Sequence, residues 1–145
     1  MYEIVKTLHS YWAYLVLIVL AIAAITAIVR TLGDKEYEAN DFRRSLFALI
    51  VSHIQLLIGL VLYFVSPRLQ LFIELGMGGI MGDSVNRLYL VEHPFVNILA
   101  VVLITMGYSK HKKKLTSNAK LKTIAIFYTL ALVLFLSRIP WSTWI

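Results

Sequence analysis

Four long apolar runs, separated by short polar segments, dominate the hydrophobic pattern of this chain. Charged residues are absent from 10–29, 45–67 and 123–137, and the run at 88–108 carries only Glu92 near its start. A helix needs about 20 mainly apolar residues to cross the hydrocarbon core of a bilayer. Because backbone groups find no water in lipid, such runs must be helical. The pattern therefore predicts an all-α integral membrane four-helix bundle.

The polar breaks between the runs give the expected limits of the spans. We expect a single transmembrane domain over 1–145, with spans at about 10–32, 45–66, 89–108 and 121–139. The segments 33–44 and 109–122 are expected to be solvated connections. The first half of 67–87 is amphipathic and could form a short helix at the membrane interface. The glycine-rich stretch 76–82 is expected to be a flexible connection.

Positive charge is distributed unevenly among the polar segments. The chain carries 14 lysines and arginines and a net charge of +6. Ten of them belong to or border 33–44 and 109–122: Arg30, Lys35, Arg43, Arg44, Lys110, Lys112, Lys113, Lys114, Lys120 and Lys122. The positive-inside rule places these loops in the cytoplasm and both termini outside, which suits a bacterial inner membrane. We interpret the basic loops as a topology signal in contact with anionic lipid, and expect no nucleic-acid binding.

Composition removes several classes of function. The chain is 59% hydrophobic and 15% charged, whereas an ordinary soluble domain has about 25% charged residues. It contains no cysteine, which excludes disulfides, iron–sulfur clusters and thiolate metal sites. The first apolar run is too long for the core of a signal peptide, and no clear cleavage site follows it, so we expect a retained span.

Three histidines lie within or at the edge of the spans, where ionisable residues are costly and often functional. His9 and His93 both begin spans that cross from the outer side, so they are expected at similar depth. His53 is expected about 12 Å from the inner end of its helix, at a rise of about 1.5 Å per residue. Two histidines that face each other in a bundle can bind the iron of a b-type haem. We therefore predict His9 and His93 as axial ligands; His111 is assigned no role.

Each of these assignments has a plain structural alternative. His9 could be an interfacial aromatic side chain, and His93 could be an ordinary residue at a helix start. Arg138 is the predicted partner of a haem propionate because of its depth and its guanidinium group. Alternatively, Arg138 extends to the interface or pairs with Glu92.

The second span carries polar residues on one helical face. Gln55 and Gly59 share this face with Ser52 and Tyr63, and Gly59 allows close approach of a helix or a flat ring. His53 points about a quarter-turn away from it. His53 could ligate a second haem, relay protons or belong to a quinone site; the alternative is a hydrogen bond to a neighbouring helix.

Two segments resemble part of a known haem bundle: SHIQLLIGLVLYF at 52–64 and EHPFVNILAVVLITMGYSK at 92–110. In haem A synthases, a histidine lies at the outer start of one helix, a Gln-x-x-x-Gly helix follows, and a second histidine opens the next helix. His9, Gln55 with Gly59, and His93 occur in that order. The whole chain also resembles small bacterial four-span proteins described as cytochrome b-like.

The resemblance implies a haem b bound by the two histidines, and it has two departures. The acidic residue that precedes the first ligand in haem A synthases is absent at the matching spacing before His9. A second half-bundle is also missing, so haem A synthesis by this chain alone is not expected.

The sequence therefore predicts a b-type haem-binding inner-membrane protein. It would pass electrons between a quinol and a membrane or periplasmic partner. The alternative is a cofactor-free structural or assembly subunit that packs against a larger respiratory or transport complex, or against copies of itself. A small transporter or channel is the third hypothesis, although no span has a broken middle or a row of charges.

Overall fold

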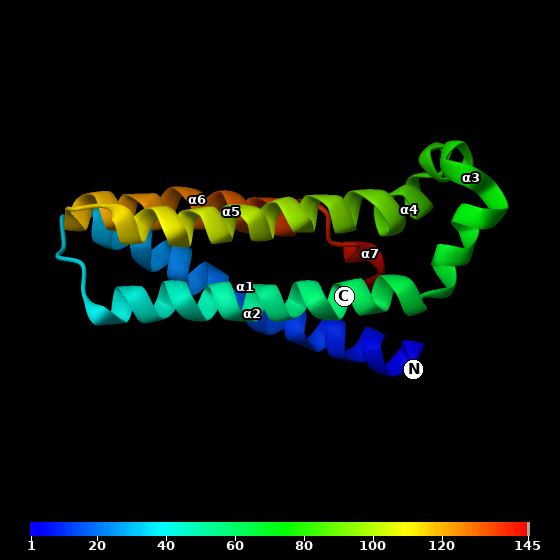
Figure 1. Cartoon of the computed structure of the whole chain (residues 1–145), viewed down its shortest axis with the longest axis horizontal. Helices are drawn as coiled ribbons and strands as arrows, with labels where there is room; N and C mark the ends of the chain where they lie inside the picture. Colours follow the sequence, from blue (N-terminus) through cyan, green and yellow to red (C-terminus); the bar gives the residue numbers. More distant parts are fainter. Residues whose placement is uncertain (145) are drawn as a thin grey trace.

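The structure, a computed structural model, describes residues 1–144 and is almost entirely helical (Figure 1). Its long helices are α1 (Tyr2–Leu32), α2 (Ala39–Val65), α5 (His93–Lys113) and α6 (Ser117–Ser137). The short helices are η1 (Pro67–Leu69), α3 (Gln70–Gly82), α4 (Ser84–Arg87), η2 (Leu88–Glu92) and α7 (Trp141–Trp144). The described residues contain no strand, so the prediction of an all-α fold is confirmed.

The four long helices form a closed ring of antiparallel neighbours. α1 packs against α2 and α6, and α5 packs against α6 and α2 (Figure 1). α2 and α5 share the least contact of these four pairs. We call the end with loops 33–38 and 114–116 the loop end; the N-terminus, α3 and α4 lie at the opposite, terminal end (Figure 1).

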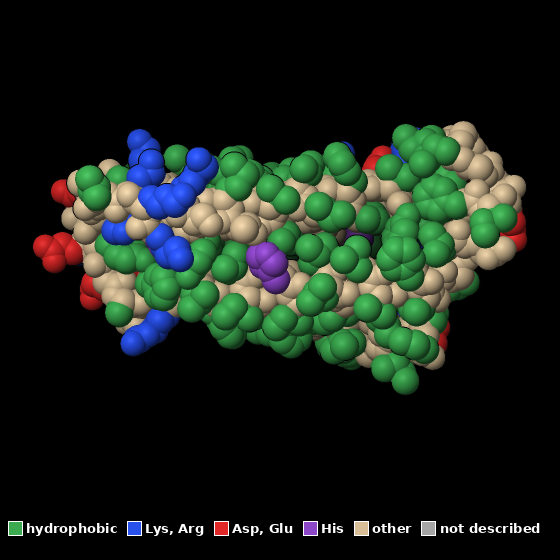
Figure 2. Space-filling model, viewed as in Figure 1, with side chains coloured by type: hydrophobic (Ala, Val, Ile, Leu, Met, Phe, Trp, Pro, Cys, Tyr) green, Lys and Arg blue, Asp and Glu red, His purple; other side chains and the backbone are tan. Residues whose placement is uncertain are grey.

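The outer surface of the bundle is apolar along its length. Four helical stretches are long and apolar enough to cross a membrane: Tyr2–Leu32, Ala39–Val65, Ser84–Lys113 and Ser117–Ser137. Large apolar side chains cover their outward faces, among them Ile18, Ile25, Leu57, Leu60, Val102 and Val133. Figure 2 shows this apolar surface, with Lys and Arg side chains gathered toward the loop end. The chain therefore has the helices of a multi-pass membrane protein.

The core is densest in the middle of the bundle and toward the loop end. Leu20, Ala24, Ala48 and Ile104 are buried where the long helices meet. The alanines let neighbouring helices approach closely. Tyr128 is also fully buried, and its hydroxyl donates a hydrogen bond of 2.8 Å to the carbonyl oxygen of Ser45. This bond ties α6 to the start of α2.

The helices continue beyond the expected spans at the loop end. The connection expected at 33–44 is a loop only over 33–38, because α2 begins at Ala39. A capping box accounts for this early start, since the Glu38 and Asp41 side chains each accept a backbone N–H of the other residue's position. The connection expected at 109–122 is likewise reduced to 114–116.

The terminal-end connection also differs from the expectation. The stretch 76–82, expected to be flexible, belongs to helix α3, which also contains the short helix expected before it. The helix breaks only at Gly76, where φ is 69°, a left-handed conformation that favours glycine. Ile80, in the second half of α3, is fully buried, and α3 packs against α4 and η1. The short helix α4 then begins at a cap in which Asp83 accepts the backbone N–H of Val85 at 3.1 Å.

Close packing of α5 against α6 depends on Gly107. A Cβ atom at this position would lie 2.5 Å from Cβ of Phe127 and 3.0 Å from its Cγ. We therefore expect Gly107→Ala to lower the free energy of unfolding by about 1–3 kcal/mol, the usual cost of overpacking a core. Thermal unfolding in detergent, followed by circular dichroism, measures the change.

The matched control for this prediction is Gly78→Ala. A Cβ atom there would have no neighbour within 4 Å. Its unfolding midpoint should stay at the wild-type value, and equal midpoints for both variants would contradict the packing described here.

Candidate functional site

The terminal-end half of the bundle encloses a cavity of about 650 Å³. Its wall comes from α1, α2, η1, η2, α5, the end of α6 and the residues that follow α6. Most of the wall is apolar, with a few polar side chains that point inward, which is usual for a small-molecule site of roughly 300–1,000 Å³. We call this space the terminal cavity. His9, Gln55, Gly59 and His93, all predicted from the sequence, belong to its wall.

His9 and His93 face each other across the terminal cavity. Their ring centres are 6.1 Å apart, and the ring planes make an angle of 78°. An iron held between two imidazoles sets the ring centres about 6 Å apart, because each metal–nitrogen bond is about 2 Å and each ring adds its own radius. The spacing therefore fits two axial ligands of one haem.

Helix geometry around His93 positions its ring. His93 follows η2, a π-helical turn over Leu88–Glu92, and such turns often occur at functional sites. Pro94 follows the π-turn within the continuous helical stretch Ser84–Lys113, so its missing N–H leaves the carbonyl oxygen of Leu90 without its α-helical donor. Tyr63 on α2 donates a hydrogen bond of 2.9 Å to the carbonyl oxygen of Leu90, which ties the π-turn to the bundle.

Hydrogen bonds define the state of the His93 ring. The Nδ1 atom lies 2.8 Å from the carbonyl oxygen of Arg138, which can only accept, so Nδ1 carries a proton. In a neutral ring, Nε2 then has the free lone pair. This arrangement is usual for metal-binding histidines, which donate the other ring N–H to a carbonyl group. The amide Nδ2 of Asn97 lies 3.1 Å from Nε2, so a metal at Nε2 requires Asn97 to turn aside.

The His9 ring rests against α2. Gln55 donates a hydrogen bond of 2.9 Å from Nε2 to the backbone carbonyl of His9. A Cβ atom at Gly59 would lie 3.2 Å from Cε1 of His9, so only glycine leaves the ring its present place. Gln55 and Gly59, predicted to share one face of α2, thus both contact His9.

Four buried polar atoms in the wall have no hydrogen-bond partner: His9 Nδ1, Ser52 Oγ, Gln55 Oε1 and Asn97 Oδ1. A buried polar atom without a partner costs about 1–3 kcal/mol, and native proteins contain few of them. Their concentration around one cavity favours a bound group that offers polar or metal contacts. The residues of the terminal cavity therefore fit a haem.

The cations near the terminal cavity are not those expected from the sequence. Arg138 does not belong to the cavity wall; its Nε lies 3.7 Å from a carboxylate oxygen of Glu92, as the alternative prediction had it. Lys6 and Arg68 line the cavity instead. The Arg68 guanidinium lies 4.0 Å from the ring centre of Tyr89, which holds the side chain in place. Depth alone suggested Arg138, whereas the turn of the chain after Ser137 directs it to Glu92.

His53 lies outside the terminal cavity. Its Nδ1 atom lies 2.8 Å from the carbonyl oxygen of Leu49, and its Nε2 atom lies 3.2 Å from Oγ1 of Thr105 on α5. A role as ligand of a haem in the terminal cavity is therefore excluded by its position. The hydrogen bond to a neighbouring helix, weighed from the sequence, is present.

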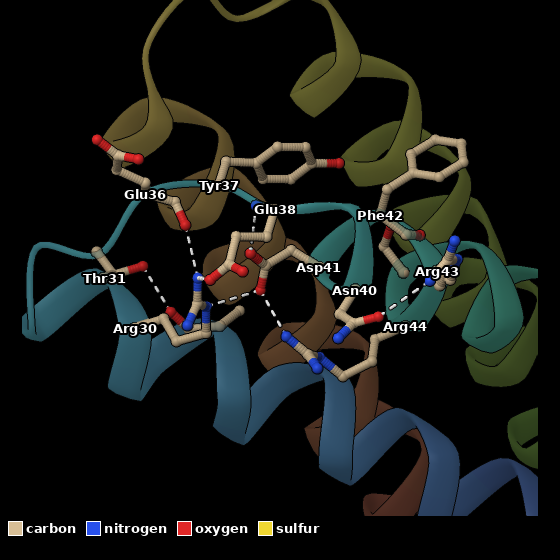
Figure 3. A network of polar contacts seen from close by, with 12 residues as sticks. Arg30, Thr31, Glu36, Tyr37, Glu38, Asn40, Asp41, Phe42, Arg43 and Arg44 are labelled. Carbon is tan, nitrogen blue, oxygen red and sulfur yellow. Dashed lines mark hydrogen bonds and ion pairs between the residues drawn. The ribbon is translucent and has the colours of Figure 1, made fainter.

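A polar cluster at the loop end was missed from the sequence (Figure 3). Asp41 is buried, and its Oδ1 forms an ion pair with Nε of Arg30 at 2.8 Å. It also accepts hydrogen bonds from Nη2 of Arg44 at 2.6 Å and from the backbone N–H of Glu38 at 2.8 Å. Arg30 also reaches the Glu38 carboxylate at 2.9 Å. These contacts join the end of α1 to the start of α2.

His111 belongs to the same end and is fully buried. Its Nδ1 atom donates to the carbonyl oxygen of Tyr108 at 2.6 Å, and its Nε2 atom lies 2.9 Å from the hydroxyl of Tyr37. Burial, with smaller contributions from Asp41 and Tyr108, raises the pKa of Tyr37 to about 12. Tyr37 therefore stays a neutral donor to His111.

The helical period offered a signal for His111. Ala100, Ile104, Gly107 and His111 are all buried and lie on one face of α5 at spacings of four, three and four residues. The surrounding lysines suggested a solvated loop and masked this period.

Comparison with known protein family models, curated proteins and solved structures finds no match to the chain. Within residues 1–144, no group of three or more His, Cys, Asp and Glu side chains could hold a metal ion. Axial ligation of a haem asks for only two such side chains. The assignment of the site therefore depends on its geometry.

Tyr37 provides a test of the loop-end cluster. Tyr37→Phe leaves Nε2 of the buried His111 without its donor, so we expect the free energy of unfolding to fall by about 1–3 kcal/mol. Tyr11→Phe is the matched control because Tyr11 is 71% exposed. Equal thermal midpoints for the two variants in detergent would show that the contact with His111 does not stabilise the bundle.

Proposed function

We propose that this chain is a b-type haem-binding membrane protein that passes electrons between a quinol and a membrane or periplasmic partner. The observation that carries the proposal is the spacing of the His9 and His93 rings, 6.1 Å between centres across a cavity. His9 and His93 would hold the haem and would leave its iron no open site, so electron transfer fits better than oxygen chemistry.

The chain's own residues have separate tasks in this proposal. The Arg138 carbonyl keeps the proton of His93 on Nδ1, so Nε2 is available as a ligand. Gly59 and Gln55 hold His9. The haem supplies one-electron chemistry when bound, and the apolar wall excludes water from it.

Propionate groups would lie at the mouth of the terminal cavity. Lys6 and Arg68 belong to the wall there, and a guanidinium can bind a carboxylate through two N–H groups. We assign Arg68 to this role in preference to Arg138, whose partner is Glu92. Asn97 lies beside the His93 ring and contributes a polar contact to whatever binds there.

The orientation in the membrane follows from charge. We infer that the loop end faces the cytoplasm of a bacterial inner membrane and that both termini face outward, because lysine and arginine concentrate at the loop end. The terminal cavity then lies toward the outer face, where a periplasmic partner could accept electrons.

The haem assignment is tested by a reduced-minus-oxidised visible spectrum of protein expressed with ample haem. We expect a sharp low-spin b-type band that is lost in His9→Ala and in His93→Ala. His53→Ala is the control and should keep the band, since His53 lies outside the terminal cavity. Circular dichroism shows that each variant is folded.

The other outcomes of this spectrum are also informative. A band that survived both His9→Ala and His93→Ala would show that the haem binds at a different site. A wild-type protein without a band would overturn the proposal and leave the cofactor-free subunit of a larger complex as the better account.

The orientation is tested by thiol labelling, since the chain has no cysteine of its own. Leu115→Cys places a thiol at the loop end, on a residue that is 97% exposed. Gly78→Cys places one at the terminal end in open space. In intact spheroplasts, a membrane-impermeant maleimide should label Gly78→Cys and reach Leu115→Cys only after permeabilisation; the reverse pattern would invert the topology.

A further inference from the structure

A second hollow, of about 480 Å³, lies between α2 and α5 on the outside of the bundle. We call it the α2/α5 groove. Its sides are apolar side chains such as Leu56 and Val102, which belong to the surface that faces lipid. Its polar lining consists of His53, Thr105 and Ser109, with Lys110 and Lys113 at the loop end. The groove lies beside the one pair of neighbouring helices that share the least contact.

His53 and Thr105 form a polar pair in this groove, and together they have more hydrogen-bond acceptors than donors. The carbonyl of Leu49 can only accept, so Nδ1 of His53 carries the proton and Nε2 has a lone pair in the neutral ring. The Thr105 hydroxyl lies 3.2 Å from Nε2 and 2.8 Å from the carbonyl oxygen of Val101. One hydroxyl proton serves two acceptors there. A ligand hydroxyl that donates to Nε2 would leave Thr105 free to keep its bond to Val101.

The groove and the terminal cavity share a wall. Leu56, Ile98 and Val101 line both spaces. A ligand in the groove is therefore separated from the terminal cavity by a single layer of apolar side chains. Electron transfer needs only a short distance, which a single layer of side chains allows. The ligand of the groove and the ligand of the cavity could mix only through a gap in this wall.

We propose that the α2/α5 groove binds the ring of a quinol or quinone that enters sideways from the lipid. This inference rests on the haem function proposed above. A quinol hydroxyl donates to Nε2 of His53, and the Thr105 hydroxyl can donate to the carbonyl oxygen of the oxidised ring. The isoprenoid tail stays in the lipid beside Val102 and Met106.

An anionic phospholipid fits the polar positions less well. Its phosphate would bind Lys110 and Lys113, which follow Thr105 by five and eight residues. At about 1.5 Å per residue, the lysines lie roughly 7–12 Å from Thr105 along the helix. The acyl chains of the lipid would then lie against His53 and Thr105. They offer no donor to the lone pair on Nε2 of His53.

The redox step balances with the groups already named. A quinol loses two electrons and two protons and becomes the quinone, with two O–H bonds broken. A haem held by His9 and His93 would supply a one-electron acceptor across the shared wall. It would pass the first electron to the membrane or periplasmic partner of the proposed function before it took up the second. The first proton passes to Nε2 of His53, and both leave to water at the loop end past Ser109 and Lys110. Oxidation there would release protons on the cytoplasmic side.

A photoreactive azidobenzoquinone with a short isoprenoid tail tests the site in the full-length chain, held in phosphatidylcholine nanodiscs. We expect label in 52–64 and 98–113, and competition by decylubiquinone or a short-tail naphthoquinone. Labelling should fall about tenfold in His53→Leu and in Thr105→Val, the effect of one hydrogen bond to a ligand. The control is Thr31→Val, because the Thr31 hydroxyl also donates to the carbonyl four residues earlier but lies outside the groove.

Three results would overturn the quinol site. The first is label spread evenly over the lipid-facing helices, and the second is label unchanged in His53→Leu. The third is label displaced by added phosphatidylglycerol but not by quinone, which would assign the groove to an anionic lipid.

A kinetic readout separates this proposal from the haem proposal. With a haem band present, reduction by decylubiquinol should slow in His53→Leu while the dithionite-reduced band keeps its intensity. An absent band with intact, competed labelling would refute the haem function and retain the quinone site. A normal band without labelling would refute the quinone site alone.

Discussion

The bundle depends on one constraint: inside a membrane, every polar group must find its partner within the protein. Several helix pairs are therefore joined by a side chain that donates to a backbone carbonyl. Trp12 donates to Val51, Gln55 to His9, Tyr63 to Leu90 and Tyr128 to Ser45, at 2.8–2.9 Å. An unpaired polar atom is costly in this setting, and four of them lie in the wall of the terminal cavity.

The two ends of the bundle differ in their packing. At the loop end, Asp41 with its arginines and the buried His111 with Tyr37 join the helices through polar contacts. At the terminal end the same helices leave a cavity, and the π-turn before His93 brings that ring opposite His9. The terminal end therefore differs from the loop end in that it encloses a cavity. The groove beside α2 and α5 shares Leu56, Ile98 and Val101 with the wall of that cavity.

Hydrophobic period predicted the four helices and their order, because the cost of unpaired backbone groups in lipid leaves few alternatives. Depth counted along the helices also brought His9 and His93 together. Gln55 and Gly59, placed on one helical face from the sequence, both contact His9. Arg138 could not be placed this way, since one turn of the chain decides between the cavity and Glu92. His111 was missed because its lysine neighbours suggested solvent, although its register on α5 is that of a core residue.

The central claim is that one iron lies between His9 and His93, and electron paramagnetic resonance of the frozen, oxidised protein tests it most directly. The ring planes make an angle of 78°, so imidazoles that held a haem in this arrangement would be nearly perpendicular. The account predicts a highly anisotropic low-spin signal, which perpendicular imidazole ligands produce. A high-spin signal would show an open axial position, and an ordinary rhombic low-spin signal would show nearly parallel rings; either result, or a protein without iron, would contradict it.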